Sequence, residues 1–136
     1  MQIEAAILAD SATDYNGRLC ILGAFDHIGA PQVPVRHPHM AVVVRVRFQR
    51  SEEGTAKFTL IMIDEDGRQY GPKLEGVVPI GFPPDGDTCV ANIILAINDL
   101  VLPKFGNYTF DFALNGEQRV SMPLYVRQRG KVNKAA

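Results

Sequence analysis

The stretch NYTFDFALNGEQRVSMPLYVRQR, residues 107–129, decides the fold class. Apolar side chains occupy every second position in both halves of this stretch: Tyr108, Phe110, Phe112, Leu114, Val120, Met122, Leu124 and Val126. A period of two predicts strands with one buried face. The Asn115-Gly116 pair between the halves is a strong signal for a tight turn between antiparallel strands. The stretch therefore predicts a β-hairpin.

The same period recurs through most of the chain. It is clearest in MAVVVRVRFQR, residues 40–50, and in TAKFTLIMIDEDG, residues 55–67, which ends in an Asp66-Gly67 turn. Asn16-Gly17 separates two extended segments and predicts an opening hairpin. About eight such segments predict an all-β fold, an antiparallel β-sandwich of Greek-key or jelly-roll topology. The one candidate for a short helix is residues 98–102.

Length and charge limit the function classes. The chain has 136 residues, enough for one domain to bury a core without disulfide support. We expect residues 1–127 to form a single domain and residues 128–136 to be a frayed basic tail. Fourteen basic and 15 acidic residues leave a net charge of -1, which gives no general attraction to nucleic acid or to anionic membranes. We therefore expect neither as a partner.

The N-terminus and the cysteines predict a cytoplasmic protein. The first residues lack the basic start and the long apolar core of a secretory signal, and no apolar run is long enough to span a bilayer. Cys20 and Cys89 each lie in an apolar segment. We expect two buried free thiols, and a disulfide between facing strands is the alternative.

Several predicted strands are apolar on both faces, although the outer faces of a two-sheet sandwich are usually polar. The residues on the second faces are Ile61, Ile63, Val90 and Ile94. One interpretation is that loops of the same chain cover them. The other is that they form a surface for self-association or for another protein.

All three histidines occur between Gly23 and Met40, together with an acid and three prolines. Asp26, His27, His37 and His39 provide the ligand types of a metal site, but their spacing matches no metal motif because no carboxylate follows His39 closely. The prolines favour an extended crossover between the two sheets. We prefer the crossover and keep a metal site as the alternative.

Acidic loops suggest a second kind of site. Asp64 and Asp66 lie in one predicted turn and Asp85 and Asp87 in another, so a calcium or ligand site between two loops is conceivable. Turn chemistry alone explains the same residues, because aspartate and glycine are typical of hairpin loops. The turn is the preferred interpretation.

With residues 19–34, the V-x-R-V-R segment and the DEDGR turn as its main features, most of the chain, and chiefly residues 3–38, resembles a family of small bacterial β-sandwich proteins of unknown function. Its pattern is an L-x-x-x-G-x-F-D-x-I strand followed by an A-P-x-x-P loop. The residues that fit are Leu19, Gly23, Phe25, Asp26, Ile28, Ala30, Pro31 and Pro34. The resemblance implies a compact β-sandwich and implies no activity.

These observations favour a non-catalytic interaction or structural module that associates with itself or with another protein. We identify no catalytic residues and expect no cofactor. The alternative is a metal-dependent enzyme or metal-binding module that uses the histidine-bearing crossover.

Overall fold

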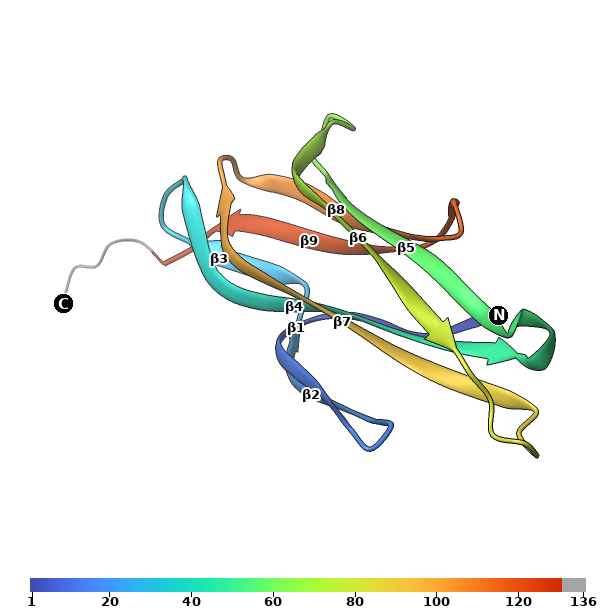
Figure 1. The fold of residues 1–136 in the computed structure, drawn as a ribbon. Helices are drawn as coiled ribbons and strands as arrows, with labels where there is room; N and C mark the ends of the chain where they lie inside the picture. The colour runs from blue at the N-terminus through green and yellow to red at the C-terminus, as the bar shows by residue number, and fades with distance from the viewer. Residues whose placement is uncertain (131–136) are drawn as a thin grey trace.

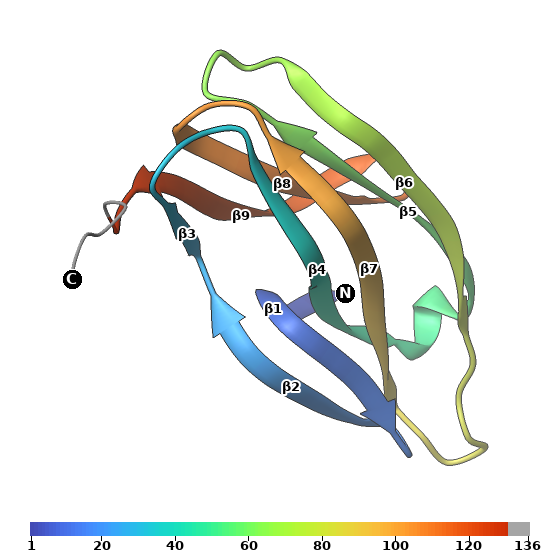
Figure 2. The same ribbon diagram turned by 90° about the vertical axis from the view of Figure 1, so that its left-hand side faces the viewer.

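The computed structural model describes residues 1–130, and these form two stacked β-sheets (Figures 1 and 2). Nine strands were found in this range, with one turn of 3-10 helix at Arg50–Glu52. The strands are β1 (Gln2–Tyr15), β2 (Arg18–Phe25), β3 (His27–Ala30), β4 (Val35–Gln49), β5 (Gly54–Ile63), β6 (Gln69–Ile80), β7 (Thr88–Leu102), β8 (Gly106–Leu114) and β9 (Glu117–Gln128). The prediction of an all-β sandwich is confirmed.

One sheet has four strands in the order β2-β1-β4-β7, and the other has five in the order β3-β9-β8-β5-β6. Every neighbouring pair is antiparallel except β3 and β9, which are parallel. The chain passes from one sheet to the other at Asp26, the single residue between β2 and β3. No helix among the described residues is long and apolar enough to cross a membrane.

The core lies between the sheets and follows the predicted alternation. Met40, Val42 and Val44 of β4 are fully buried against the other sheet, where Phe112 and Leu124 are also fully buried. Burying a side chain of this size contributes about 1.5–3 kcal/mol, so this alternation is the main source of stability. Among the described residues, no polar or charged residue is fully buried.

The predicted tight turns are present. Asn16 and Gly17 have φ values of 52° and 80°, and Asn115 and Gly116 have 51° and 82°. Two successive left-handed residues characterise the type I′ turn, whose twist matches that of the flanking strands. The opening and closing hairpins are both confirmed.

The crossover differs from the expected loop. Residues 27–30 form the short strand β3 beside β9, and β4 already includes His37 and His39. The helix expected at residues 98–102 is wrong: the segment belongs to β7, and Asp99 has a left-handed φ of 55° within it. Aspartate tolerates this conformation, so the strand accommodates an irregularity there without becoming a helix.

The end of the chain is held further than expected. Gln128 belongs to β9, and the backbone N–H of Arg129 donates to the carbonyl of Ala30 at 2.8 Å. Residues 131–136 of the predicted tail lie outside the described residues.

Candidate functional site

The first hairpin extends beyond the sheet from which it starts. β1 pairs with β4 from Gln2 to Ala9, whereas its pairing with β2 continues to Tyr15. We call residues 10–25, the part of the hairpin beyond β4, the arm. In Figure 1 the arm bends away from β4 and lies below β4 and β7.

The bend requires a glycine. Gly23 has a left-handed φ of 73°, which side chains other than glycine adopt at a cost. A Cβ atom at this position would lie 2.5 Å from Oδ2 and 2.9 Å from Cγ of Asp10 on the opposite strand. The Asp10 side chain therefore occupies the space that the absent Cβ leaves.

A hydrogen-bond network, which we call the latch, fastens the tip of the arm to the outer face of the four-stranded sheet. Asn92 of β7 donates through Nδ2 to Oδ2 of Asp14 at 2.9 Å and to the carbonyl of Gly17 at 3.3 Å. Arg45 of β4 donates through Nη1 to Oδ1 of Asn92 at 2.9 Å. Asp14 also accepts from the N–H of Gly17 at 2.9 Å, which stabilises the turn itself. The tip of the arm is thus tied to β7 through Asn92, and to β4 both through Asn92 and through a longer hydrogen bond, 3.5 Å, from Nη1 of Arg45 to the carbonyl of Gly17.

Glu4 anchors the other side of this network. Its carboxylate pairs with the guanidinium groups of Arg45 and Arg47. The hydrogen bond from Arg47 lowers the pKa of Glu4, and the hydrogen bond from Asn92 lowers the pKa of Asp14. Both carboxylates are therefore charged at neutral pH and balance the two arginines.

The arm explains why β4 is apolar on both faces. Ala41 and Val43 point away from the core, yet they are 2% and 0% exposed. On the arm, Ala12, Leu19 and Ile21 are half-buried, whereas their neighbours are exposed. Together with the latch, this burial pattern shows the arm covering the outer face of β4. For this face, the cover comes from the same chain.

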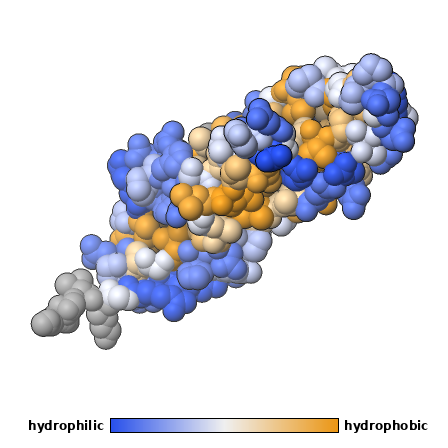
Figure 3. All heavy atoms as spheres, turned by 90° about the horizontal axis from the view of Figure 1, so that it is seen from below, coloured by the Kyte–Doolittle hydropathy of each residue, from blue (hydrophilic) through white to orange (hydrophobic). Residues whose placement is uncertain are grey.

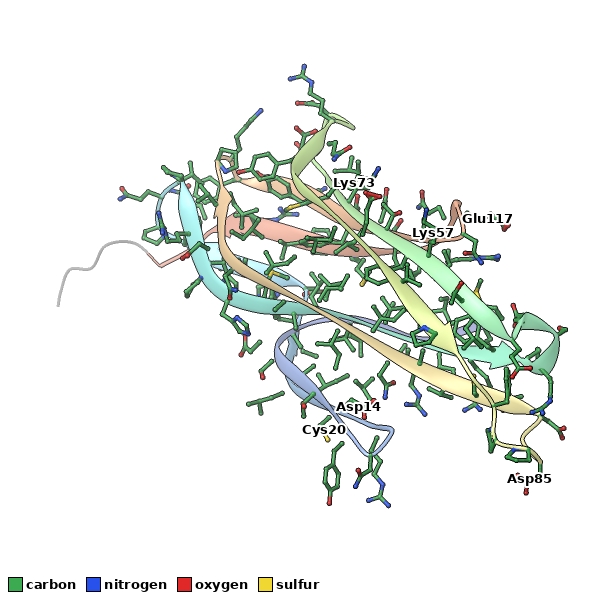
Figure 4. All side chains as sticks on the ribbon, viewed as in Figure 1. Asp14, Cys20, Lys57, Lys73, Asp85 and Glu117 are labelled. Atoms are coloured by element: carbon green, nitrogen blue, oxygen red, sulfur yellow. The ribbon has the colours of Figure 1, made fainter. Side chains whose placement is uncertain are left out.

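The other face of the arm is open. Leu22 is 71% exposed and Tyr15 is 59% exposed, values that no other large apolar residue described exceeds. Figure 3 views the molecule from below and shows apolar side chains gathered between hydrophilic margins. Cys20 lies on the arm as well (Figure 4) and its thiol is free and exposed, which corrects the expectation that it is buried. Cys89 is free and half-buried. The prediction that both cysteines are free thiols therefore agrees with the structure.

Each of the three histidines contacts a different neighbouring residue. Nδ1 of His27 lies 3.0 Å from Oδ1 of Asp26, and Nδ1 of His39 lies 2.7 Å from Oδ1 of Asn98. The His37 ring lies 5.5 Å from the ring of Phe25, between centroids. Within residues 1–130, no group of three or more histidine, cysteine, aspartate or glutamate side chains is arranged to hold a metal ion. The four residues of the metal alternative are therefore not brought together as a site.

The two acidic loops lie at opposite ends of β6, which runs from the turn with Asp64 to the loop with Asp85. Its twelve residues separate them by about 35 Å. Asp64 accepts hydrogen bonds from the backbone N–H groups of Asp66 and Arg68, as turn chemistry requires. A shared site for Asp64, Asp66, Asp85 and Asp87 is thus excluded by the distance.

The four residues predicted for self-association do not form one surface. Ile61 and Ile63 lie on the five-stranded sheet, opposite Asp111 and Thr109 of β8. Val90 and Ile94 lie on the four-stranded sheet, opposite Arg47 and Val43. All four are half-buried.

The sequence interpretation missed the open face of the arm. A signal for it was present, because the Asn16-Gly17 turn pairs Tyr15 with Arg18 and so places Cys20, Leu22 and Ala24 on one face. What periodicity could not indicate is which face would remain open, since that depends on the bend at Gly23.

The sequence matches the family described as "Family of unknown function (DUF6941)" over residues 4–127. The chain belongs to this family, which confirms the expected membership of an uncharacterised family. No curated protein matches the sequence significantly.

Proposed function

We propose that this family member is a non-catalytic interaction module that associates with a second copy of itself through the arm. The observation that supports the proposal is the 71% exposure of Leu22 on a strand that pairs on one side only. Large apolar side chains exposed on an otherwise polar surface commonly mark protein–protein contacts.

The polar groups support a structural role. The cluster of Glu4, Arg45 and Arg47 is joined to the latch, where Asp14 provides the second carboxylate that balances the two arginines. Its contacts with Asn92 and Gly17 hold the arm in place. The three histidines make separate local contacts.

Charge and thiol chemistry support a protein partner in a reducing compartment. A net charge of -1 provides no general attraction to nucleic acid. An exposed free thiol such as that of Cys20 persists in the cytoplasm, where disulfides are rare.

The test is the molar mass in solution, measured by size-exclusion chromatography with light scattering over a wide concentration range. We expect a reversible dimer of twice 15.0 kDa. Leu22→Lys should convert it to monomer. Val77→Lys is the matched control, because Val77 is 59% exposed on β6 of the other sheet.

Ile61→Lys provides a second comparison, since Ile61 belongs to the contact first predicted from the sequence. Dimers that survive Leu22→Lys and dissociate with Ile61→Lys would move the contact to the five-stranded sheet. A monomer at every concentration would refute self-association.

A further inference from the structure

The four edge strands of the two sheets differ in how they are protected. Edge strands expose unpaired backbone groups, and natural proteins protect them by short length, charge, proline or irregularity. β3 has only four residues, β6 contains Glu75 and Pro79, and β7 is interrupted by Asp99 in a left-handed conformation. β2 has no charge and no proline in its interior, from Leu19 to Phe25, and its irregularity is the left-handed Gly23 near its end.

The hairpin geometry determines which backbone groups of β2 are free. In a hairpin with a two-residue loop, the residues flanking the loop form a hydrogen-bonded pair, and such pairs recur at every second position. Tyr15 and Arg18 flank the loop, so Cys20 and Leu22 direct their backbone groups at β1. Leu19 and Ile21 therefore direct theirs outward, to the open edge, whereas the left-handed Gly23 departs from this regular alternation.

Charge then selects a partner. β2 begins with Arg18, and Asp26 follows its last residue, with no charged residue between them. Both ends are exposed, and the side chain of Asp26 is 64% exposed. A second copy of β2 running antiparallel presents the same charges in the opposite order, so each Arg18 meets an Asp26 when the two strands are centred on Leu22.

We infer that two copies of the chain pair edge to edge through β2, antiparallel and centred on Leu22, an inference that rests on the self-association proposed above. In this register Ile21, whose backbone groups are directed outward, lies opposite the left-handed Gly23 of the partner copy. Leu22 lies opposite itself in a non-hydrogen-bonded pair, where side chains are closest. The two four-stranded sheets become one continuous sheet with a two-fold axis at Leu22.

The contact is small, because a single strand pair and one pair of leucines bury less than the roughly 1,200 Å² typical of stable complexes. We therefore expect a weak, concentration-dependent dimer. Its specificity comes from the two Arg18–Asp26 pairs and from the register.

The first experiment uses single thiols in the full-length chain. With Cys20→Ala and Cys89→Ala in place, Leu22→Cys puts one thiol at the two-fold axis. The matched control keeps Cys20 as the only thiol. In the inferred register Cys20 lies opposite Ala24, so the two Cys20 positions are about 13 Å apart along the strands, beyond the reach of a disulfide.

Under mild oxidation at fixed protein concentration, the Leu22→Cys variant should form disulfide-linked dimers about tenfold faster than the Cys20 control. Adding Ala24→Cys to the Cys20 control should restore the fast reaction, because Cys20 then meets the introduced thiol of the partner copy. Unchanged rates in both variants would overturn the register.

The second experiment exchanges the charges. Arg18→Asp and Asp26→Arg should each weaken the dimer, because each places like charges opposite one another. The double variant should recover dimerisation, and an equimolar mixture of the two single variants should form heterodimers. Equal thermal unfolding midpoints for all variants, measured at a concentration where the protein is monomeric, establish that the changes act on association and not on folding.

The outcomes separate the two claims. A dimer by light scattering with no preference for the Leu22→Cys cross-link and no charge rescue overturns the register and leaves self-association standing. A monomer throughout, with cross-linking no faster than in the control, overturns both. Fast cross-linking at position 22 with charge rescue supports both.

Discussion

The bend of the arm at Gly23 provides the sharpest test of the folding argument. Gly23→Ala adds one methyl group at a residue with φ of 73°, where it meets the side chain of Asp10. Gly17→Ala is the matched control, because Gly17 has a similar φ of 80° and its added Cβ would meet nothing within 4 Å. Both variants share the backbone cost, and only Gly23→Ala has the contact.

The magnitudes follow from these two terms. A left-handed conformation costs an alanine about 1–2 kcal/mol. The loss of glycine flexibility in the unfolded chain returns about 0.4–1 kcal/mol. We therefore expect Gly17→Ala to lower the free energy of unfolding by about 1 kcal/mol. Displacing Asp10 from its rotamer adds about 1 kcal/mol, so Gly23→Ala should cost about 2 kcal/mol.

The assay is urea unfolding followed by far-UV circular dichroism at a concentration where the protein is monomeric, with the free energy extrapolated linearly. The double variant Asp10→Ala/Gly23→Ala should recover about 1 kcal/mol relative to Gly23→Ala, since the Oδ2 and Cγ atoms of Asp10, the two closest to the methyl group, are gone. Equal costs for Gly17→Ala and Gly23→Ala, or no recovery in the double variant, would refute the account of the bend.

Three further predictions concern the latch, the thiols and the core. The pKa values of Glu4 and Asp14 are lowered in the folded state, so their stabilising contribution is complete above the unfolded pKa values near 4 and is lost as the pH falls through the lower folded values. The thermal unfolding temperature should therefore fall as the pH is lowered below about 4. In Asn92→Ala this fall should be less steep. Parallel curves of unfolding temperature against pH for the two proteins would contradict a role for the latch. Alkylation should modify Cys20 before Cys89, because Cys20 is exposed whereas burial raises the pKa of the Cys89 thiol. Peptide mass spectrometry at early times gives the order of modification. Equal rates for the two thiols would be inconsistent with the arm as described. Phe112→Ala should lower the free energy of unfolding, measured in urea, by about 3–5 kcal/mol, because Phe112 is fully buried in the core. Val77→Ala should lower it by less than about 0.5 kcal/mol, because Val77 is exposed. Similar losses for the two variants would contradict the assignment of core and surface.

The parts of the fold that depend on neighbouring residues were predictable. Asn16-Gly17 and Asn115-Gly116 determine their hairpins because both residues of each pair accept positive φ. The separation of Asp64 from Asp85 was also within reach, since successive turns of an antiparallel sheet alternate between its two ends.

Features that depend on distant partners were not predictable in the same way. His27–Ala30 becomes a strand only because β9 provides its hydrogen bonds. Four residues are too few for an alternating pattern to predict a strand there. Burial of Val43 on an outer face depends on the bend at Gly23, which an apolar alternation does not encode. The sequence identified two-sided apolar strands at Ile61, Ile63, Val90 and Ile94, which lie in β5 and β7. The apolar outer face of β4 was found only in the structure.

The parallel pairing of β3 with β9 has a consequence for the order of folding. Tyr125 pairs with His27 from roughly 100 residues further along the chain, and such distant contacts slow folding. During synthesis the arm and β3 leave the ribosome early, while β9, the strand that holds β3 in its sheet, arrives near the end. Over that interval β3 lacks its partner strand on an unfinished chain, and unpaired strands are the condition under which nascent β proteins aggregate. Slow translation or low temperature should therefore affect the yield of this protein through β9, although the residues at risk lie at the other end.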